Sequence, residues 1–115
     1  MKHKSIKIGY RNYEFKKIDK DFSDSHGQFL SKEGLIGLSD EDNISHVNTL
    51  LHEVLHAIIY QWGLDVGDKE EHIVNVLANA TTTVLVDNPW LTKYLEEKLK
   101  WKIWMEKTLT QRLWN

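Results

Sequence analysis

Two runs within the first forty positions of the chain alternate between polar and apolar residues, which is the period of a β-strand. The alternation covers residues 5–10 and 13–18. Arg11 and Asn12 stand between the two runs and are the expected turn. This pattern predicts a β-hairpin at the start of the chain.

Two shorter apolar runs follow the hairpin and are further strand candidates. They cover residues 28–30 and 34–38, and the polar segment 31–34 between them has the composition of a turn. With the hairpin, these runs predict a small N-terminal sheet of antiparallel type.

After position 40 the apolar residues recur every three or four positions, which is the period of an α-helix. The apolar stripe of the first predicted helix consists of Val47, Leu50, Leu51, Val54, Leu55, Ile58 and Ile59. Gly63 is expected to end this helix. A second helix is predicted over about 69–86 and stops at Asn88 and Pro89. Pro89 suits the first position of a third helix, capped by Asp87 or Asn88 and able to run to the C-terminus.

The expected fold class is therefore α+β, with a small N-terminal sheet followed by three helices. The chain has 115 residues, no internal repeat and no linker-like segment, which predicts a single domain over 1–115. This length can bury a core without disulfides. The sequence has no cysteine, so thiolate nucleophiles and cysteine-type zinc sites are excluded.

Composition and charge narrow the classes of function. Apolar residues make up 41% of the chain and charged residues 28%, and the net charge is −2. The one basic stretch, 98–102, is flanked by glutamates and is interpreted as a solvated helix face, so no nucleic acid partner is expected. No apolar run reaches the 18 or so residues that span a bilayer, so no membrane association is expected. No apolar stretch follows the basic N-terminus, so no secretory signal is expected and the predicted location is the cytoplasm.

The pattern that carries chemistry lies in the first predicted helix, where His52, Glu53 and His56 form a His-Glu-x-x-His sequence. Residues four apart on a helix project from the same face, so the two imidazoles can bind one metal ion. Glu53 projects to the side of that ion. A zinc ion lowers the pKa of its water ligand, and a carboxylate at this position can accept the proton as general base. We therefore expect a zinc site here.

A catalytic zinc needs a third protein ligand, and the start of the second predicted helix offers three candidates. Glu71 is the first choice, because it shares a helix face with the small residues Ala78 and Thr82. Glu70 is the second candidate and His72 the third. The donor set suits zinc, although iron, cobalt or nickel would also accept it.

Three segments together resemble a known family. These are LLHEVLHAI (50–58), EEHIVNVLA (70–78) and DNP (87–89). The chain resembles the zincin-like metallopeptidases of the gluzincin type, is similar to small peptidases of bacteriophages and prophages, and is more distantly similar to the ImmA/IrrE-type peptidases. The resemblance covers roughly residues 34–92.

The resemblance implies a minimal zincin-like fold and zinc-dependent hydrolysis of peptide bonds in a protein or peptide substrate. The location would be the cytoplasm of a bacterial host cell if a phage encodes the chain. It further implies an edge strand, expected at 34–38, that holds an extended substrate by strand addition. Asn75 stands where the large gluzincins place an acidic residue that hydrogen-bonds a ligand.

The chain departs from the family pattern in other respects. The interval from His56 to Glu71 is shorter than in the large gluzincins, so the connecting loop must be tight. No oxyanion-stabilising residue aligns, and the candidates for that role are Tyr60, His46 and His26. A metzincin assignment fails, because Ile59 stands where that group has glycine.

Four tryptophans near the C-terminus support an alternative function. They are Trp90, Trp101, Trp104 and Trp114. Packing in the core explains most of them, and the other interpretation is an aromatic surface for a protein partner or a second copy of the chain. The alternatives to a peptidase are thus a non-catalytic zinc module that binds a partner through this helix, and a metal-free helical interaction protein.

Overall fold

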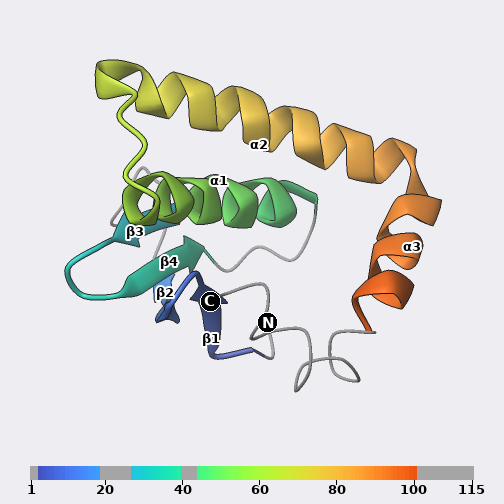
Figure 1. The fold of residues 1–115 in the computed structure, drawn as a ribbon, viewed down its shortest axis with the longest axis horizontal. Helices are drawn as coiled ribbons and strands as arrows, with labels where there is room; N and C mark the ends of the chain where they lie inside the picture. The colour runs from blue at the N-terminus through green and yellow to red at the C-terminus, as the bar shows by residue number, and fades with distance from the viewer. Residues whose placement is uncertain (1–2, 19–26, 40–43, 101–115) are drawn as a thin grey trace, which may run out of the picture. The chain divides into compact units, whose positions relative to one another are not determined.

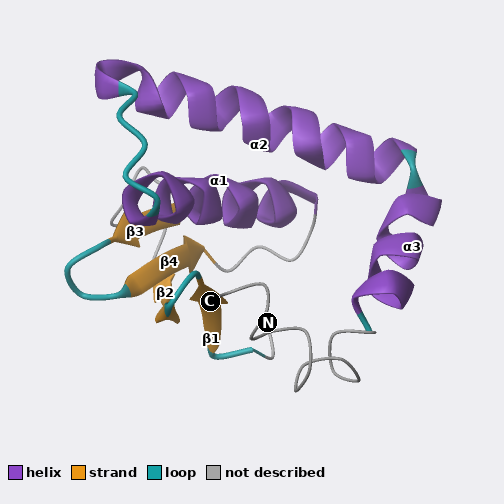
Figure 2. Ribbon diagram, in the orientation of Figure 1, coloured by secondary structure: helices purple, strands orange, loops and turns teal. Residues whose placement is uncertain are grey.

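The computed structural model describes residues 3–18, 27–39 and 44–100 of the chain. Four strands precede three helices along the sequence (Figures 1 and 2). The elements are β1 (Ser5–Ile8), β2 (Arg11–Ile18), β3 (Gly27–Leu30), β4 (Leu35–Ser39), α1 (Ile44–Gln61), the short 3-10 helix η2 (Gly67–Lys69), α2 (Glu70–Asp87) and α3 (Pro89–Leu99). The predicted α+β class, with an N-terminal sheet followed by three helices, is confirmed.

The sheet is mixed, whereas the sequence pattern suggested an antiparallel one. Its strand order is β1-β2-β4-β3. The pairs β1–β2 and β3–β4 are antiparallel hairpins, and β2 and β4 run parallel, with Phe15 opposite Ile36. Alternation of polar and apolar residues gives the faces of each strand but not the direction of its neighbour, so the parallel pair was not foreseeable from the pattern.

The order of the strands also corrects the expected edge strand. Residues 34–38 were predicted to form the substrate-binding edge, but β4 is paired on both sides, by β2 and by β3. The edges of the sheet in the described part of the chain are β1 and β3. Among the described strands, an extended peptide could therefore add only to β1 or β3.

The first hairpin turns two residues earlier than predicted. Ile8 pairs with Arg11, so Gly9 and Tyr10 form the turn. Gly9 has φ of 62°, and a two-residue hairpin of type II′ requires such a positive φ at its first central residue. Arg11 is a strand residue whose guanidinium donates to the backbone oxygen of Ser31, 2.8 Å away. Gly9, and not the predicted pair Arg11 and Asn12, therefore determines the position of the turn.

The core lies between the sheet and α1, which lies across the sheet and contacts β3, β4 and β1 (Figure 1). The buried residues of this core are Ile8, Tyr13, Ile36, Leu38 and Ala57. Leu50 and Val54 of the predicted apolar stripe pack against it, as expected. Val47 and Ile58 are exposed instead, because the face that meets the sheet is centred on Glu53 and Ala57.

The end of α1 is set by Gly63, as predicted. The amide of Leu64 donates to the oxygen of Ile59, and the amide of Gly63 to that of Tyr60, which is the hydrogen-bond pattern of a Schellman motif. Gly63 has the positive φ, 65°, that this ending requires. The chain then reaches α2 within a few residues, so the two helices are closely linked along the sequence.

The chain divides into two compact units, Met1–Thr82 and Thr83–Asn115, with the division inside α2. In the first unit α2 runs alongside α1, and the amide nitrogen of Asn48 donates to the side-chain oxygen of Asn79 (Figure 1). The buried face of α2 carries Val74, Ala78 and Thr82. A single domain over 1–115 stays a prediction.

The second unit contains α3, which begins at Pro89 as predicted. Asn88 is the capping residue by position, but its side chain donates to the backbone oxygen of Val84 and caps no amide of α3. Trp90 is exposed and meets Tyr94 edge to face. Trp101, Trp104 and Trp114 lie outside the described residues. None of the described helices combines the length and the apolar character that crossing a lipid bilayer requires.

Candidate metal centre

His52 and His56 lie one turn apart on α1 and direct their rings toward each other. Their Nε2 atoms are 3.1 Å apart. The ring centroids are 4.8 Å apart, and the planes meet at 67°. Both side chains are largely buried, at 16% and 13% exposure. The four-residue spacing thus places both nitrogen donors at one point, as the sequence predicted.

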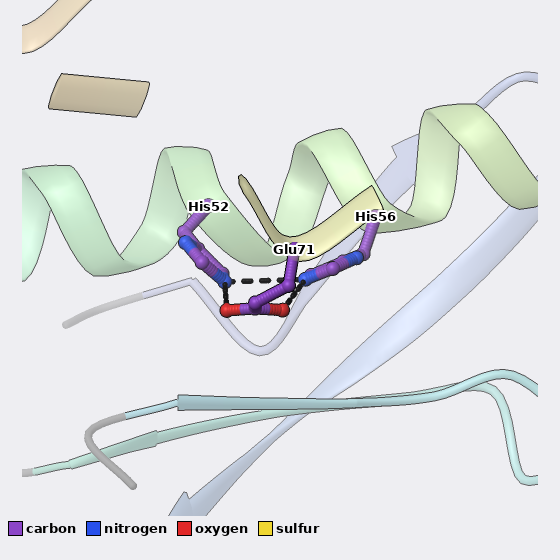
Figure 3. A group of neighbouring side chains, drawn as sticks. All are labelled: His52, His56 and Glu71. Carbon is purple, nitrogen blue, oxygen red and sulfur yellow. Dashed lines mark hydrogen bonds and ion pairs between the residues drawn. The ribbon is translucent and has the colours of Figure 1, made fainter. Parts of the chain in front are cut away.

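Glu71, in the first turn of α2, lies against both histidines and completes a group of three possible metal ligands (Figure 3). Its Oε1 is 2.9 Å from Nε2 of His52, and its Oε2 is 2.9 Å from Nε2 of His56. The ligand atoms of the three residues all lie within 4.8 Å of one another. This group could hold a metal ion.

The other two candidates for third ligand lie differently. Glu70 contacts the far nitrogen of His56, with its Oε2 2.7 Å from Nδ1. His72 is exposed and does not line the cavity at the site. Of the three acidic or histidine residues at the start of α2, Glu71 is therefore the one whose carboxylate meets both Nε2 atoms.

The separations between the donor atoms suit a tetrahedral ion. Ligands bonded to zinc at about 2.0–2.1 Å stand roughly 3.3 Å from one another in a tetrahedron. The two Nε2 atoms here are 3.1 Å apart, which is close to that value. Each is also 2.9 Å from a different oxygen of Glu71, Oε1 for His52 and Oε2 for His56, so either carboxylate oxygen could complete the group around an ion.

The count of protons at these atoms gives a second argument for a cation. A carboxylate only accepts hydrogen bonds, and each Nε2 atom carries at most one proton. Three close contacts therefore share at most two protons, and at least one contact cannot be a hydrogen bond. A metal ion satisfies all three donors at once. The arrangement is typical of a metal site.

Glu53 lies beside this group and is almost completely buried, with 5% of its surface exposed. Burial raises the pKa of its carboxyl from 4.5 to about 7. The partial positive charge of His56 opposes this shift, and the negative charge of Glu71 adds to it. Burial also lowers the pKa of His52, while Glu71 raises it. Near neutral pH the metal-free site therefore holds a carboxyl able to gain or lose a proton.

This raised pKa predicts how stability depends on pH in the metal-free protein. Glu53 binds its proton more tightly in the folded than in the unfolded protein. Its contribution to the free energy of unfolding is therefore complete below pH 4.5 and is lost as the pH rises through 7. Glu53→Gln should remove this loss and stabilise the protein at pH 8 by on the order of 2 kcal/mol, allowing for solvent screening. Urea unfolding with a chelator at pH 5 and pH 8 measures it.

The wild type and Glu53→Gln are compared at each pH because the lowered pKa of His52 makes the stability of both proteins rise with pH below 6.5. The difference in unfolding free energy then isolates Glu53. An advantage of Glu53→Gln that is equal at both pH values would contradict the prediction.

A cavity of about 460 Å³ opens at the site. It is lined by Gly27, Phe29, His52, Glu53, His56, Glu70 and Glu71. The side chain of Glu71 is 64% exposed, so the ligand group borders solvent while Glu53 is buried beneath it. A substrate could thus reach the ligand group from outside.

Gly27, at the start of β3, lies very close to the buried carboxyl. A β-carbon at this position would stand 2.8 Å from Oε2 of Glu53 and 2.6 Å from Cγ2 of Thr49. Only glycine leaves room for β3 to approach α1 so closely. The edge strand therefore covers Glu53, and sequence reasoning missed this role because a lone glycine carries no signal of what it touches.

The other described sequence candidates do not line the cavity. Tyr60 is exposed and meets Phe29 edge to face at 5.9 Å, and neither Tyr60 nor His46 lines the cavity. His26 lies outside the described residues. Asn75 is exposed and makes no hydrogen bond to His52 or His56, so it does not replace the acidic partner of the large gluzincins.

Comparisons with known proteins identify no relative of the chain. No family model matches the chain, and neither a curated protein nor a solved structure is significantly similar to it.

Proposed function

We propose that the chain is a zinc-dependent peptidase, with His52, His56 and Glu71 as metal ligands and Glu53 as general base. One observation carries the proposal. The donor atoms of the three ligand residues lie within 4.8 Å of one another, and a buried carboxyl lines the same cavity. Two nitrogens and one oxygen make the donor set of many catalytic zinc sites, which leave one position open.

The residues of the chain have distinct roles in this proposal. His52 and His56 bind through Nε2, and Glu71 binds through its carboxylate. Zinc, when bound, would polarise a peptide carbonyl and lower the pKa of a coordinated water toward about 7. Glu53 takes up a proton from the attacking water on a carboxylate oxygen and later delivers it to the nitrogen of the leaving amine, because its carboxyl lines the same cavity as the three ligand residues.

The proposed substrate is a protein or peptide in extended conformation. β3 is an edge strand of the sheet, and its residues Gly27 and Phe29 line the cavity. A peptide that pairs with this edge would lie beside the ligand group. β3 thus replaces the 34–38 segment as the proposed substrate strand. A cytoplasmic location, in a bacterial host cell if a phage encodes the chain, stays a prediction.

The test combines metal analysis with a search for hydrolysis. Protein purified without added metal is expected to contain about one zinc per chain. A mixed peptide library, analysed by mass spectrometry, should be cleaved by this protein, not cleaved after chelation, and cleaved again after zinc is restored. A zinc content near zero that added zinc cannot raise would overturn the proposal.

The exposed residues of α3 favour a second function for the chain. Trp90 and Tyr94 form an exposed aromatic pair, and Leu95 and Leu99 are exposed on the same helix. Such a surface is typical of a protein contact. If the chain acts as a non-catalytic zinc module, Trp90→Ala should abolish partner binding and Glu53→Gln should leave it unchanged.

A further inference from the structure

The imidazole of His56 lies between two consecutive carboxylates at the start of α2. Its Nε2 is 2.9 Å from Oε2 of Glu71, and its Nδ1 is 2.7 Å from Oε2 of Glu70. Neighbouring residues on a helix point about 100° apart, so two successive side chains can reach opposite edges of one ring. The ring is thereby held on both sides.

Both nitrogens of His56 face a carboxylate oxygen, Nδ1 that of Glu70 and Nε2 that of Glu71, and a carboxylate only accepts. With a metal ion held at Nε2, the one proton of the neutral ring would be on Nδ1, which would donate to Glu70. A neutral ring with its proton on Nδ1 has a lone pair on Nε2, the atom that faces His52 and Glu71. A ring that donates to a carboxylate also becomes a stronger base, and hence a stronger metal ligand.

We propose that Glu70 is a positioning residue that fixes the tautomer and the orientation of His56 and so increases the affinity of the site for zinc. This inference rests on the proposed metal site. It gives Glu70 a role separate from that of Glu71, although the sequence presented the two as alternatives for one position. Glu70 would also be the carboxylate partner of a ligand histidine that Asn75 does not provide.

His52 offers an internal comparison for this role. Among the described residues, its interactions are made through Nε2, with His56 and Glu71, and its Nδ1 has no carboxylate partner. Removing the Glu70 carboxylate should therefore change the ring of His56 and leave the ring of His52 nearly unchanged.

A general stabilisation of α2 is the competing explanation for any effect of Glu70. Acidic residues in the first turn of a helix interact favourably with its positive end, whatever they contact. Glu70→Gln loses this charge but keeps an oxygen that can accept from Nδ1. Asp68→Asn removes an exposed charge from η2, two residues away, without touching the site.

The experiment measures the zinc affinity of four full-length proteins, by competition with a chromophoric chelator. The proteins are the wild type, Glu70→Ala, Glu70→Gln and Asp68→Asn. We expect Glu70→Ala to weaken zinc binding by about 10–100-fold. Glu70→Gln should weaken it less, because the accepting oxygen remains. Asp68→Asn should bind within about threefold of the wild type.

Nitrogen NMR of the imidazoles in the zinc-loaded proteins provides a readout that a structural role would not move. In the wild type, Nδ1 of His56 should give the signal of a protonated, hydrogen-bonded nitrogen, and Glu70→Ala should shift it while the His52 signals stay in place. Unchanged zinc affinity in Glu70→Ala, or an equal loss in Asp68→Asn, would overturn the inference alone. A wild-type protein that binds no zinc would overturn the proposed function as well.

Discussion

Replacing Glu53 with glutamine is expected to lower the rate of peptide hydrolysis by at least about a hundredfold while zinc stays bound. General acid–base catalysis by a positioned side chain contributes typically 10²–10⁴-fold, and glutamine cannot take up the proton. Zinc should stay bound because Glu53 is not one of the three proposed ligands, which are His52, His56 and Glu71. Zinc content and kcat measured on the same preparation test both halves of this expectation.

Glu33→Gln is the matched control for this substitution. It makes the same chemical change at an exposed position, in the turn between β3 and β4, and should leave hydrolysis unchanged. If Glu53→Gln retained its zinc and most of its activity, the general base would have to be another group. A loss of zinc together with activity would instead mean that Glu53 supports the ligands.

Replacing any one of the three ligand residues with alanine is expected to have the second largest effect. Removing a residue that hydrogen-bonds a metal ligand typically lowers metal affinity 10–100-fold, so removing a ligand itself should lower it more than about 100-fold. His52→Ala, His56→Ala and Glu71→Ala should lose zinc and hydrolysis together. Chelator competition gives the affinity, and thermal unfolding with and without zinc gives the linked stabilisation.

Two histidines near the site serve as controls for the ligand variants. His46 precedes His52 on the same helix, and His72 follows Glu71 directly, but neither lines the cavity. Both His46→Ala and His72→Ala should keep zinc affinity within a few-fold of the wild type. A large loss in His72→Ala with none in Glu71→Ala would reverse the choice of third ligand.

The sequence predicted the local features of this fold well because short-range rules govern them. Gly63 ends α1, Pro89 begins α3, and the four-residue spacing places His52 and His56 together. The choice of Glu71 among its neighbours also agreed with its position against both rings. Each of these depends on the period of a helix or on the backbone of one residue.

The features that depend on long-range pairing were not predictable. Nothing in residues 34–38 distinguishes a central strand from an edge strand, so the segment predicted as an edge is the central strand β4, and β3 is an edge. Glu70 was ranked only as a substitute ligand, because its contact with Nδ1 depends on where α2 starts relative to His56. The burial of Glu53 depends on the approach of Gly27, which the pattern of α1 alone does not reveal.

Because Gly27 lies so close to Glu53, metal binding and the raised pKa of Glu53 depend on different stretches of the chain. The three residues that could hold a metal ion all lie in one contiguous segment, from 52 to 71. The raised pKa of Glu53 depends on a strand about 25 residues earlier in the sequence. Contacts close in sequence form more readily than distant ones. A partly folded chain could therefore retain zinc without an active base, and metal content alone would not report a working enzyme.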